Sequence, residues 1–184
     1  VAFNALHGKF GEDGCMSAIL EMLEIPYTHS GVLASAIAMH KEKSKALFRE
    51  AGVPVAESKL VPIEIAADAH PMSLPYVIKP VDEGSSVGVH IVTSNSNGPA
   101  AIVLEQREIF GDQAMVERFI PGKELTCAVM GEEALGVIEI RPAEGLTFYD
   151  YDAKYVPGGS IHVLPAPLLP NVYQLVRQYT LKAH

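Results

Sequence analysis

A lysine followed by a short loop of glycines and serines is the pattern in this sequence that most directly indicates chemistry. Lys79 lies near the end of the apolar stretch PYVIKP (75–80), and EGSSVGV (83–89) follows it. Small residues let backbone amides approach an anion, hydroxyl groups add donors, and a lysine at a strand end supplies positive charge. The common phosphate-binding loop differs, because its lysine follows the glycines. The pattern predicts a phosphate site, with a surface turn between two strands as the plainer alternative.

A second glycine-bearing loop, HGKFGEDG (7–14), follows the short apolar run VAFNAL (1–6). After this loop, apolar residues recur with the spacing of one helix face (Met16, Ile19, Leu20 and Leu23). The pair Ile25-Pro26 is expected to end that helix. A strand, a loop and a helix in this order indicate an α/β unit. The loop would then lie at a helix N-terminus, where free amides attract carboxylate or phosphate groups.

The rest of the chain mixes strands with helices. One helix is expected over 33–51, because Gly52 and Pro54 follow it as stop signals. The further predicted elements are strands at 75–80, 90–94, 114–120, 125–130 and 134–140, a helix over about 100–108, and a helix over the last dozen residues. Residues 145–160 are aromatic and flanked by glycine, and they lack a helical period. These patterns predict an α+β fold of antiparallel sheets with helices, preceded by part of an α/β domain.

Composition excludes several functional classes. The chain carries 14 Lys and Arg against 22 Asp and Glu, a formal net charge of −8, which argues against a nucleic-acid partner. No run approaches the roughly 18 apolar residues of a membrane helix. Its two cysteines, Cys15 and Cys127, predict a reduced intracellular protein with buried thiols. No secretion signal follows Val1, so we expect a cytoplasmic protein without a membrane partner.

Four segments, in order along the chain, resemble the D-alanine–D-alanine ligase family of ATP-grasp enzymes. They are LHGKFGEDG (6–14), YVIKP with EGSSVGV (76–89), VERFIPGKELT (116–126) and FYDYDAKY (148–155), and SGVLASAIAMHKEKSK (30–45) is also similar. The resemblance implies three parts: the end of an N-terminal α/β substrate domain (1–40), a central ATP-grasp subdomain (41–115) and the start of a C-terminal ATP-grasp subdomain (116–184) with its lid loop (145–160).

The same resemblance assigns a nucleotide site. Lys41 and Lys79 match the two ATP-binding lysines of this region, and Glu124 matches the acid that binds ribose. The hinge that holds adenine corresponds to Glu117, Arg118, Phe119 and Ile120. Without the family, Lys41 would be read as a solvated charge beside Lys43 and Lys45. Glu117 would likewise be read as a solvated strand residue.

The resemblance also implies a substrate site and a lid. Ser85 and Ser86 belong to a loop that closes over phosphates and substrate, while His7 and Glu12 lie in the loop that lines the pocket of the first substrate. On the mobile loop, Lys154 would reach the γ-phosphate, and Tyr155 would link to Ser85 near the first D-alanine. Ser85, Lys154 and Tyr155 are therefore the predicted catalytic residues. Packing among neighbouring aromatic side chains is the plainer reading of Tyr155.

The implied reaction is ATP-dependent ligation of two D-alanines through an acyl phosphate, for peptidoglycan precursor synthesis. ATP and Mg²⁺ are the implied cofactors, with metal ligands outside this segment, and a homodimer is expected. The alternatives are a ligase with another product, such as D-alanyl-D-lactate, and a truncated nucleotide-binding module without turnover. Tyr155 favours the dipeptide.

Departures from the family pattern are His29, His40 and the pair Asp82-Glu83, whose charges lie beside the phosphate loop.

Overall fold

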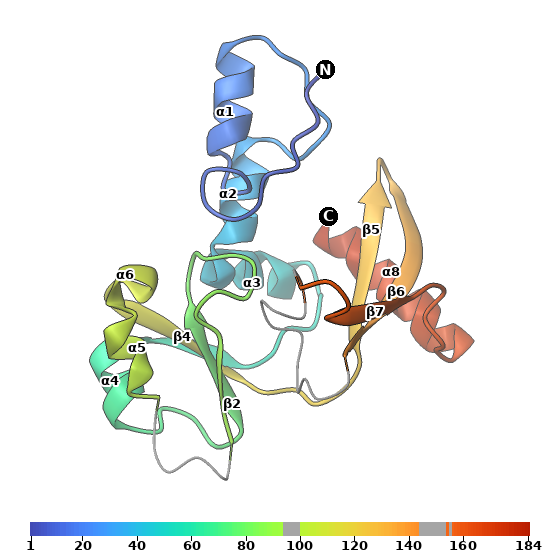
Figure 1. Ribbon diagram of the computed structural model, residues 1–184. Helices are drawn as coiled ribbons and strands as arrows, with labels where there is room; N and C mark the ends of the chain where they lie inside the picture. The colour runs from blue at the N-terminus through green and yellow to red at the C-terminus, as the bar shows by residue number, and fades with distance from the viewer. Residues whose placement is uncertain (94–99, 144–153, 155) are drawn as a thin grey trace. The chain divides into compact units, whose positions relative to one another are not determined.

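The computed structural model describes residues 1–93, 100–143, 154 and 156–184 (Figure 1). These residues form two compact units. The first contains residues 1–46 and 56–119, and the second contains residues 47–55 and 120–184. The three-part division inferred from the family resemblance stays a prediction.

A four-stranded antiparallel sheet organises the first unit. Its strands are β1 (Ser58–Pro62), β2 (Tyr76–Pro80), β3 (His90–Val92) and β4 (Gln113–Arg118), in the order β1-β4-β2-β3. Along β2, burial alternates: Tyr76 and Ile78 are buried, whereas Val77 and Lys79 are partly exposed on the other face. This period-two pattern is that of a strand with one face on a core. A shift of one residue would drive Lys79 into that core, so the pattern fixes the register.

Three short helices, α4 (Ile63–Asp68), α5 (Ile102–Glu105) and α6 (Arg107–Phe110), contribute to the core of this unit. Its buried cluster includes Ile63, Tyr76, Ile78, Val103, Phe110 and Val116. Residues of β2 and β4 that point away from this cluster share the opposite face of the sheet. Lys79 pairs with Met115 and Val77 pairs with Glu117, so Lys79 and Glu117 are diagonal neighbours on that face. Long side chains reach across such a diagonal.

Two helices replace the single helix that was predicted over 33–51. They are α2 (Val32–Met39) and α3 (Lys41–Glu50), and His40 between them has extended backbone angles (φ −85°, ψ 96°). The amide of Lys41 donates to the carbonyl oxygen of Val81, 2.9 Å away, instead of continuing the ladder of α2. The prediction of one helix was wrong because this bond to the loop after β2 ends α2.

Helix α1 (Cys15–Met22) confirms the helix predicted after the 7–14 loop. The strand predicted over residues 1–6 is reduced to a single parallel bridge between Ala2 and Tyr27. The buried thiols were also predicted wrongly. Cys15 is exposed because it opens α1, and Cys127 is half-buried, although both are free as expected.

The second unit contains a three-stranded antiparallel sheet in the order β5-β6-β7, with strands β5 (Glu124–Met130), β6 (Glu133–Pro142) and β7 (Ser160–Val163). Strands β5 and β6 confirm the predicted hairpin. Helix α8 (Pro170–Ala183) packs on it: the Arg177 guanidinium donates to the Ala134 carbonyl at 2.6 Å and 3.1 Å. The Tyr173 hydroxyl accepts the Val137 amide at 2.9 Å. No helix in the described parts of the chain is long and apolar enough to cross a membrane.

Candidate functional site

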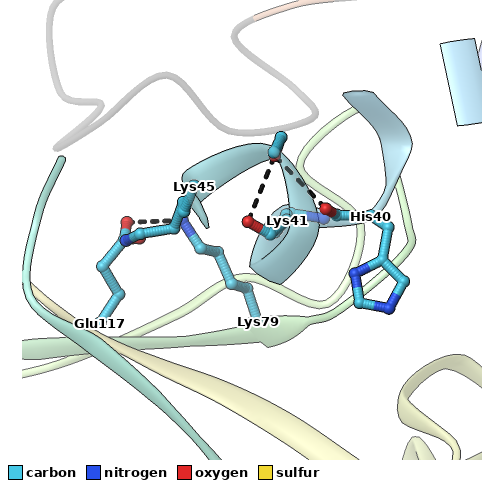
Figure 2. A network of polar contacts seen from close by, with 6 residues as sticks. His40, Lys41, Lys45, Lys79 and Glu117 are labelled. Carbon is cyan, nitrogen blue, oxygen red and sulfur yellow. Dashed lines mark hydrogen bonds and ion pairs between the residues drawn. The ribbon is translucent and has the colours of Figure 1, made fainter. Parts of the chain in front are cut away.

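Lys45, Lys79 and Glu117 come from three elements and meet on the face of the first unit's sheet that lies opposite its buried cluster (Figure 2). The ammonium of Lys79, from β2, donates to Oε1 of Glu117, from β4, at 2.6 Å. The ammonium of Lys45, from α3, forms an ion pair with the other carboxylate oxygen of Glu117. All three side chains are largely buried, with exposed fractions of 10% for Lys45, 17% for Glu117 and 19% for Lys79.

The pairing keeps Glu117 ionised. Burial by itself would raise the pKa of the Glu117 carboxyl, but hydrogen bonds from Lys45 and Lys79, together with their charges, lower it below its ordinary value. The carboxylate therefore carries one negative charge against two ammonium groups. This face of the sheet keeps an excess of positive charge, although water has only limited access to it.

A third lysine adds to that excess. Lys41 opens α3, and its ammonium donates to the backbone carbonyl of Glu83, in the loop after β2. Burial, and then the charge of Lys79, lower the pKa of Lys41 from its ordinary 10.5 to about 8. Asp82 and Glu83 act in the opposite direction with smaller effects. The lowered pKa of Lys41 therefore comes first from its burial, and the charges of Asp82 and Glu83 act against that of Lys79. A bound anion would favour the charged form of Lys41.

The glycine-serine loop makes a tight turn next to these lysines. Ser85 and Ser86 both have positive φ (53° and 62°), and the Val87 amide donates to the Gly84 carbonyl at 3.1 Å. Two central residues with positive φ and this hydrogen bond are the features of a type I′ turn. Residues other than glycine rarely adopt such angles, at a cost of about 1–3 kcal/mol each, and do so most often at functional sites.

The two glycine-bearing loops of the sequence lie against each other. A Cβ added at Gly84 would meet Gly8 Cα at 3.5 Å and Glu12 Oε2 at 3.6 Å. Between the loops lies a cavity of about 490 Å³ within the first unit. Its lining includes Glu12, His29, Ser35, Lys41, Glu83 and Ser85. It therefore offers carboxylates, an ammonium and hydroxyl groups to one small ligand.

His29 adds unused hydrogen-bonding capacity to this cavity. Both of its ring nitrogens are buried without a hydrogen-bond partner, and the ring lies 4.4 Å from that of Tyr27 between centroids. A buried polar group without a partner is unfavourable and calls for a water or a ligand. The cavity that His29 lines is therefore suited to a polar ligand.

Among the residues whose structure is described, no group of three His, Cys, Asp or Glu side chains could hold a metal ion. The cations of the described site are its lysines.

Comparison with known proteins identifies the family. The profile of the family described as "D-ala D-ala ligase C-terminus" matches residues 47–184. The chain belongs to the D-alanine–D-alanine ligase family. It is 60% identical to a D-alanine–D-alanine ligase of Parvibaculum lavamentivorans and 59% identical to D-alanine–D-alanine ligase B of Mesorhizobium japonicum, over 184 residues in each case. These alignments cover all of this chain and 59% of each relative.

Solved structures of similar proteins agree with the fold of this family. The D-alanine–D-alanine ligase of Bacillus anthracis complexed with ATP matches with a TM-score of 0.74 and 29% identity, over 99% of this chain and 57% of that one. The VanG D-Ala:D-Ser ligase of Enterococcus faecalis matches with 0.72 and 29%, over 98% and 54%. The predicted α+β, ATP-grasp fold is confirmed. The chain spans about three fifths of the length of its relatives.

The structure brings together some of the residues that the family resemblance indicated. Lys79 and Glu117 form an ion pair on one sheet face, and their charges act on Lys41. Lys41, Glu12 and Ser85 line one cavity. Ser86 lies in the serine turn, whereas His7 is exposed and is not part of the cavity lining. Arg118 ends β4, and the Phe119 amide donates to the Pro75 carbonyl at 3.2 Å.

The other predicted site residues belong to the second unit. Ile120 is exposed, Glu124 begins β5, and Lys154 also lies in this unit. Tyr155 lies outside the described residues.

Lys45 is the residue of this site that the sequence prediction missed. It was read with Lys43 as part of a solvated helix face, yet Lys45 is buried and only Lys43 is exposed. The spacing contained a signal, because Lys45 follows Lys41 by four residues and both therefore lie on one face of α3. Lys43 is two residues away and lies on a different face.

Proposed function

We propose that this chain carries the nucleotide site and part of the substrate site of an ATP-dependent D-alanine–D-alanine ligase. The reaction joins two D-alanines through an acyl phosphate for peptidoglycan precursor synthesis. One observation carries the proposal: Lys45 and Lys79 share the Glu117 carboxylate on one sheet face, and Lys41 lies within reach of the Lys79 charge, beside a strained serine turn. The family assignment and the ATP complex of the B. anthracis relative support it. The proposed setting is a cytoplasmic homodimer.

The lysines suit a polyphosphate. Phosphoryl transfer depends mainly on positioning and on neutralising charge that spreads over the phosphate oxygens. Lys41 and Lys79 would hold phosphate oxygens, while Glu117 and the segment through Ile120 would hold adenine and Glu124 the ribose. Lys154 would neutralise the γ-phosphate from the lid. Mg²⁺ would be held by ligands outside this segment and would supply further positive charge.

The cavity between the loops suits a small zwitterion. The first D-alanine has an ammonium group, which a carboxylate such as Glu12 can pair with, and a carboxylate, which Ser85 and Lys41 can reach with donors. Charge-assisted hydrogen bonds of this kind are about twice as strong as neutral ones. Because an acyl phosphate hydrolyses readily, closing the serine turn and the lid over the substrate would protect the intermediate from water.

The decisive experiment is product analysis with a chain completed to the length of its relatives. We expect release of ADP that depends on D-alanine, with D-alanyl-D-alanine as the product. ATP binding without release of ADP would support the alternative of a nucleotide-binding module without turnover. Relatives that are 54–60% identical are named D-alanine–D-alanine ligase, which favours the dipeptide over a depsipeptide.

The identity of the second substrate can be tested at Tyr155. The Tyr155→Phe change removes one hydroxyl group and little volume. If that hydroxyl links the lid to Ser85, we expect the variant to accept some D-lactate, while its affinity for ATP stays within about threefold of the original. Competition between D-alanine and D-lactate, followed by product analysis, measures this, and Tyr179→Phe on α8 is a matched control. An unchanged product ratio and rate would remove Tyr155 from the site.

The lowered pKa of Lys41 predicts how ATP affinity depends on pH. In the free protein Lys41 loses its proton as the pH rises above about 8, whereas a bound phosphate favours the charged form. ATP affinity should therefore fall with rising pH, by up to about tenfold per unit until the pKa of the bound state is reached. Calorimetry from about pH 7 to about pH 10 measures it.

Lys41→Arg provides the control for this pH dependence. Arginine stays charged over the whole range, so its profile should be nearly flat. A fall of equal steepness in both proteins would assign the titration to another group.

A further inference from the structure

Lys45 is the buried lysine of the described chain, with 8% of its surface exposed. A lysine is almost never buried unless it is paired, because its ammonium loses hydration. Its ammonium pairs here with Oε2 of Glu117, while Oε1 of the same carboxylate accepts from Lys79. One carboxylate thus divides its two oxygens between two lysines from different elements.

We propose that Lys45 is a positioning residue of the nucleotide site, which holds Glu117 so that Lys79 keeps positive charge available for the bound nucleotide. The inference rests on the proposed function, because it assigns a role within the same site. In this role Lys45 contacts the Glu117 carboxylate and not the nucleotide.

The arrangement of charges explains why a second cation is needed. Glu117 is ionised and lies on the same sheet face as Lys79, so these two alone would form a neutral pair. With both carboxylate oxygens turned toward Lys79, its ammonium would be largely satisfied and would lose attraction for a phosphate. Lys45 takes one oxygen and restores a net charge of one to the cluster. Lys45, Lys79 and Glu117 together can then bind an anion without breaking the ion pair between Lys79 and Glu117.

A purely structural role is the competing explanation, because the Lys45–Glu117 ion pair also joins α3 to β4. A structural anchor would affect unfolding, but it would leave the ATP affinity of the folded protein unchanged. A positioning residue has another signature: its importance disappears once Glu117 loses its charge. The two explanations can therefore be distinguished by replacing Lys45 both in the original protein and in a variant whose Glu117 has lost its charge.

The experiment measures ATP affinity by calorimetry in the full chain, for Lys45→Met in the original background and in a Glu117→Gln background. We expect Lys45→Met to weaken ATP binding at least about tenfold in the first background and less than about threefold in the second. Lys45→Arg should recover most of the affinity, because it keeps the charge. Lys43→Met, at the exposed lysine nearby, is the matched control and should have no effect.

Equal effects of Lys45→Met in both backgrounds, or none in either, would overturn the inference. If Lys45→Met does not fold, Lys45→Gln decides by the same criteria, since it keeps a donor for Glu117 but no charge. A different result would contradict the proposed function, namely that the original protein does not bind ATP at all. ATP binding that is lost with Lys79→Ala but kept with Lys45→Met would overturn only the role of Lys45.

Discussion

Replacing Lys79 by alanine is expected to weaken ATP binding by about 30- to 700-fold. The change removes a charge-assisted phosphate contact from a site where the lysine side chain is only 19% exposed. Losing such a contact costs about 2–4 kcal/mol, and each 1.4 kcal/mol corresponds to about tenfold in affinity. Calorimetric titration with ATP, in a chain completed to the length of its relatives, measures the change directly.

The structure also indicates that the Lys79→Ala protein should fold. Glu117 keeps its ion pair with Lys45, so the substitution does not leave an unpaired buried carboxylate. Lys43→Ala is the control, because Lys43 lies on α3 with Lys45 but its side chain is 66% exposed. A loss of affinity below threefold for Lys79→Ala, or a similar loss for Lys43→Ala, would contradict the assignment of Lys79 to the phosphates.

The strand that carries Lys79 could be predicted because its pattern is local. PYVIKP alternates between residues that enter the core and residues that leave it, and the structure places β2 there. The hairpin of β5 and β6 was predictable for the same reason, since two apolar runs flank a short polar turn. In both cases the residues that determine the element are neighbours in the sequence.

The break between α2 and α3 could not be predicted in this way. Neither glycine nor proline marks it, and α2 ends because the Lys41 amide bonds to Val81, forty residues further along the chain. The burial of Lys45 has a similar origin. Its position on α3 was visible, but its partner Glu117 lies on a strand that only the fold brings near. Long-range contacts therefore determined the part of the site that sequence reasoning missed.

Strand β1 and helix α4 were missed in a stretch rich in proline, alanine and serine. Strand β1 forms because it pairs with β4, from Ser58 opposite Glu117 to Pro62 opposite Gln113. Its proline lies at the strand end and on the edge of the sheet, where a missing donor is tolerated. The serine turn is comparable, because Ser85 and Ser86 take positive φ where residue type alone would favour glycine.

Residues 1–184, prepared as an isolated polypeptide, are expected not to ligate D-alanine. The alignment with the P. lavamentivorans relative covers 59% of that protein, and no group of three potential ligands for a metal occurs among the described residues of this chain. Phosphoryl transfer to a carboxylate brings two anions together, and its rate depends on metal ions and cations that neutralise them. The lysines described here supply only part of that charge.

The measurement is ADP release coupled to D-alanine at saturating magnesium and ATP. Residues 1–184 are measured beside the full-length P. lavamentivorans relative and its matching segment, since the two sequences are 60% identical over that segment. We expect the segment to be at least about a thousandfold slower, because removing one group that stabilises the transition state already costs about a hundred- to a thousandfold. Comparable rates for the segment and the full-length protein would show that the segment supplies all the groups that the reaction needs.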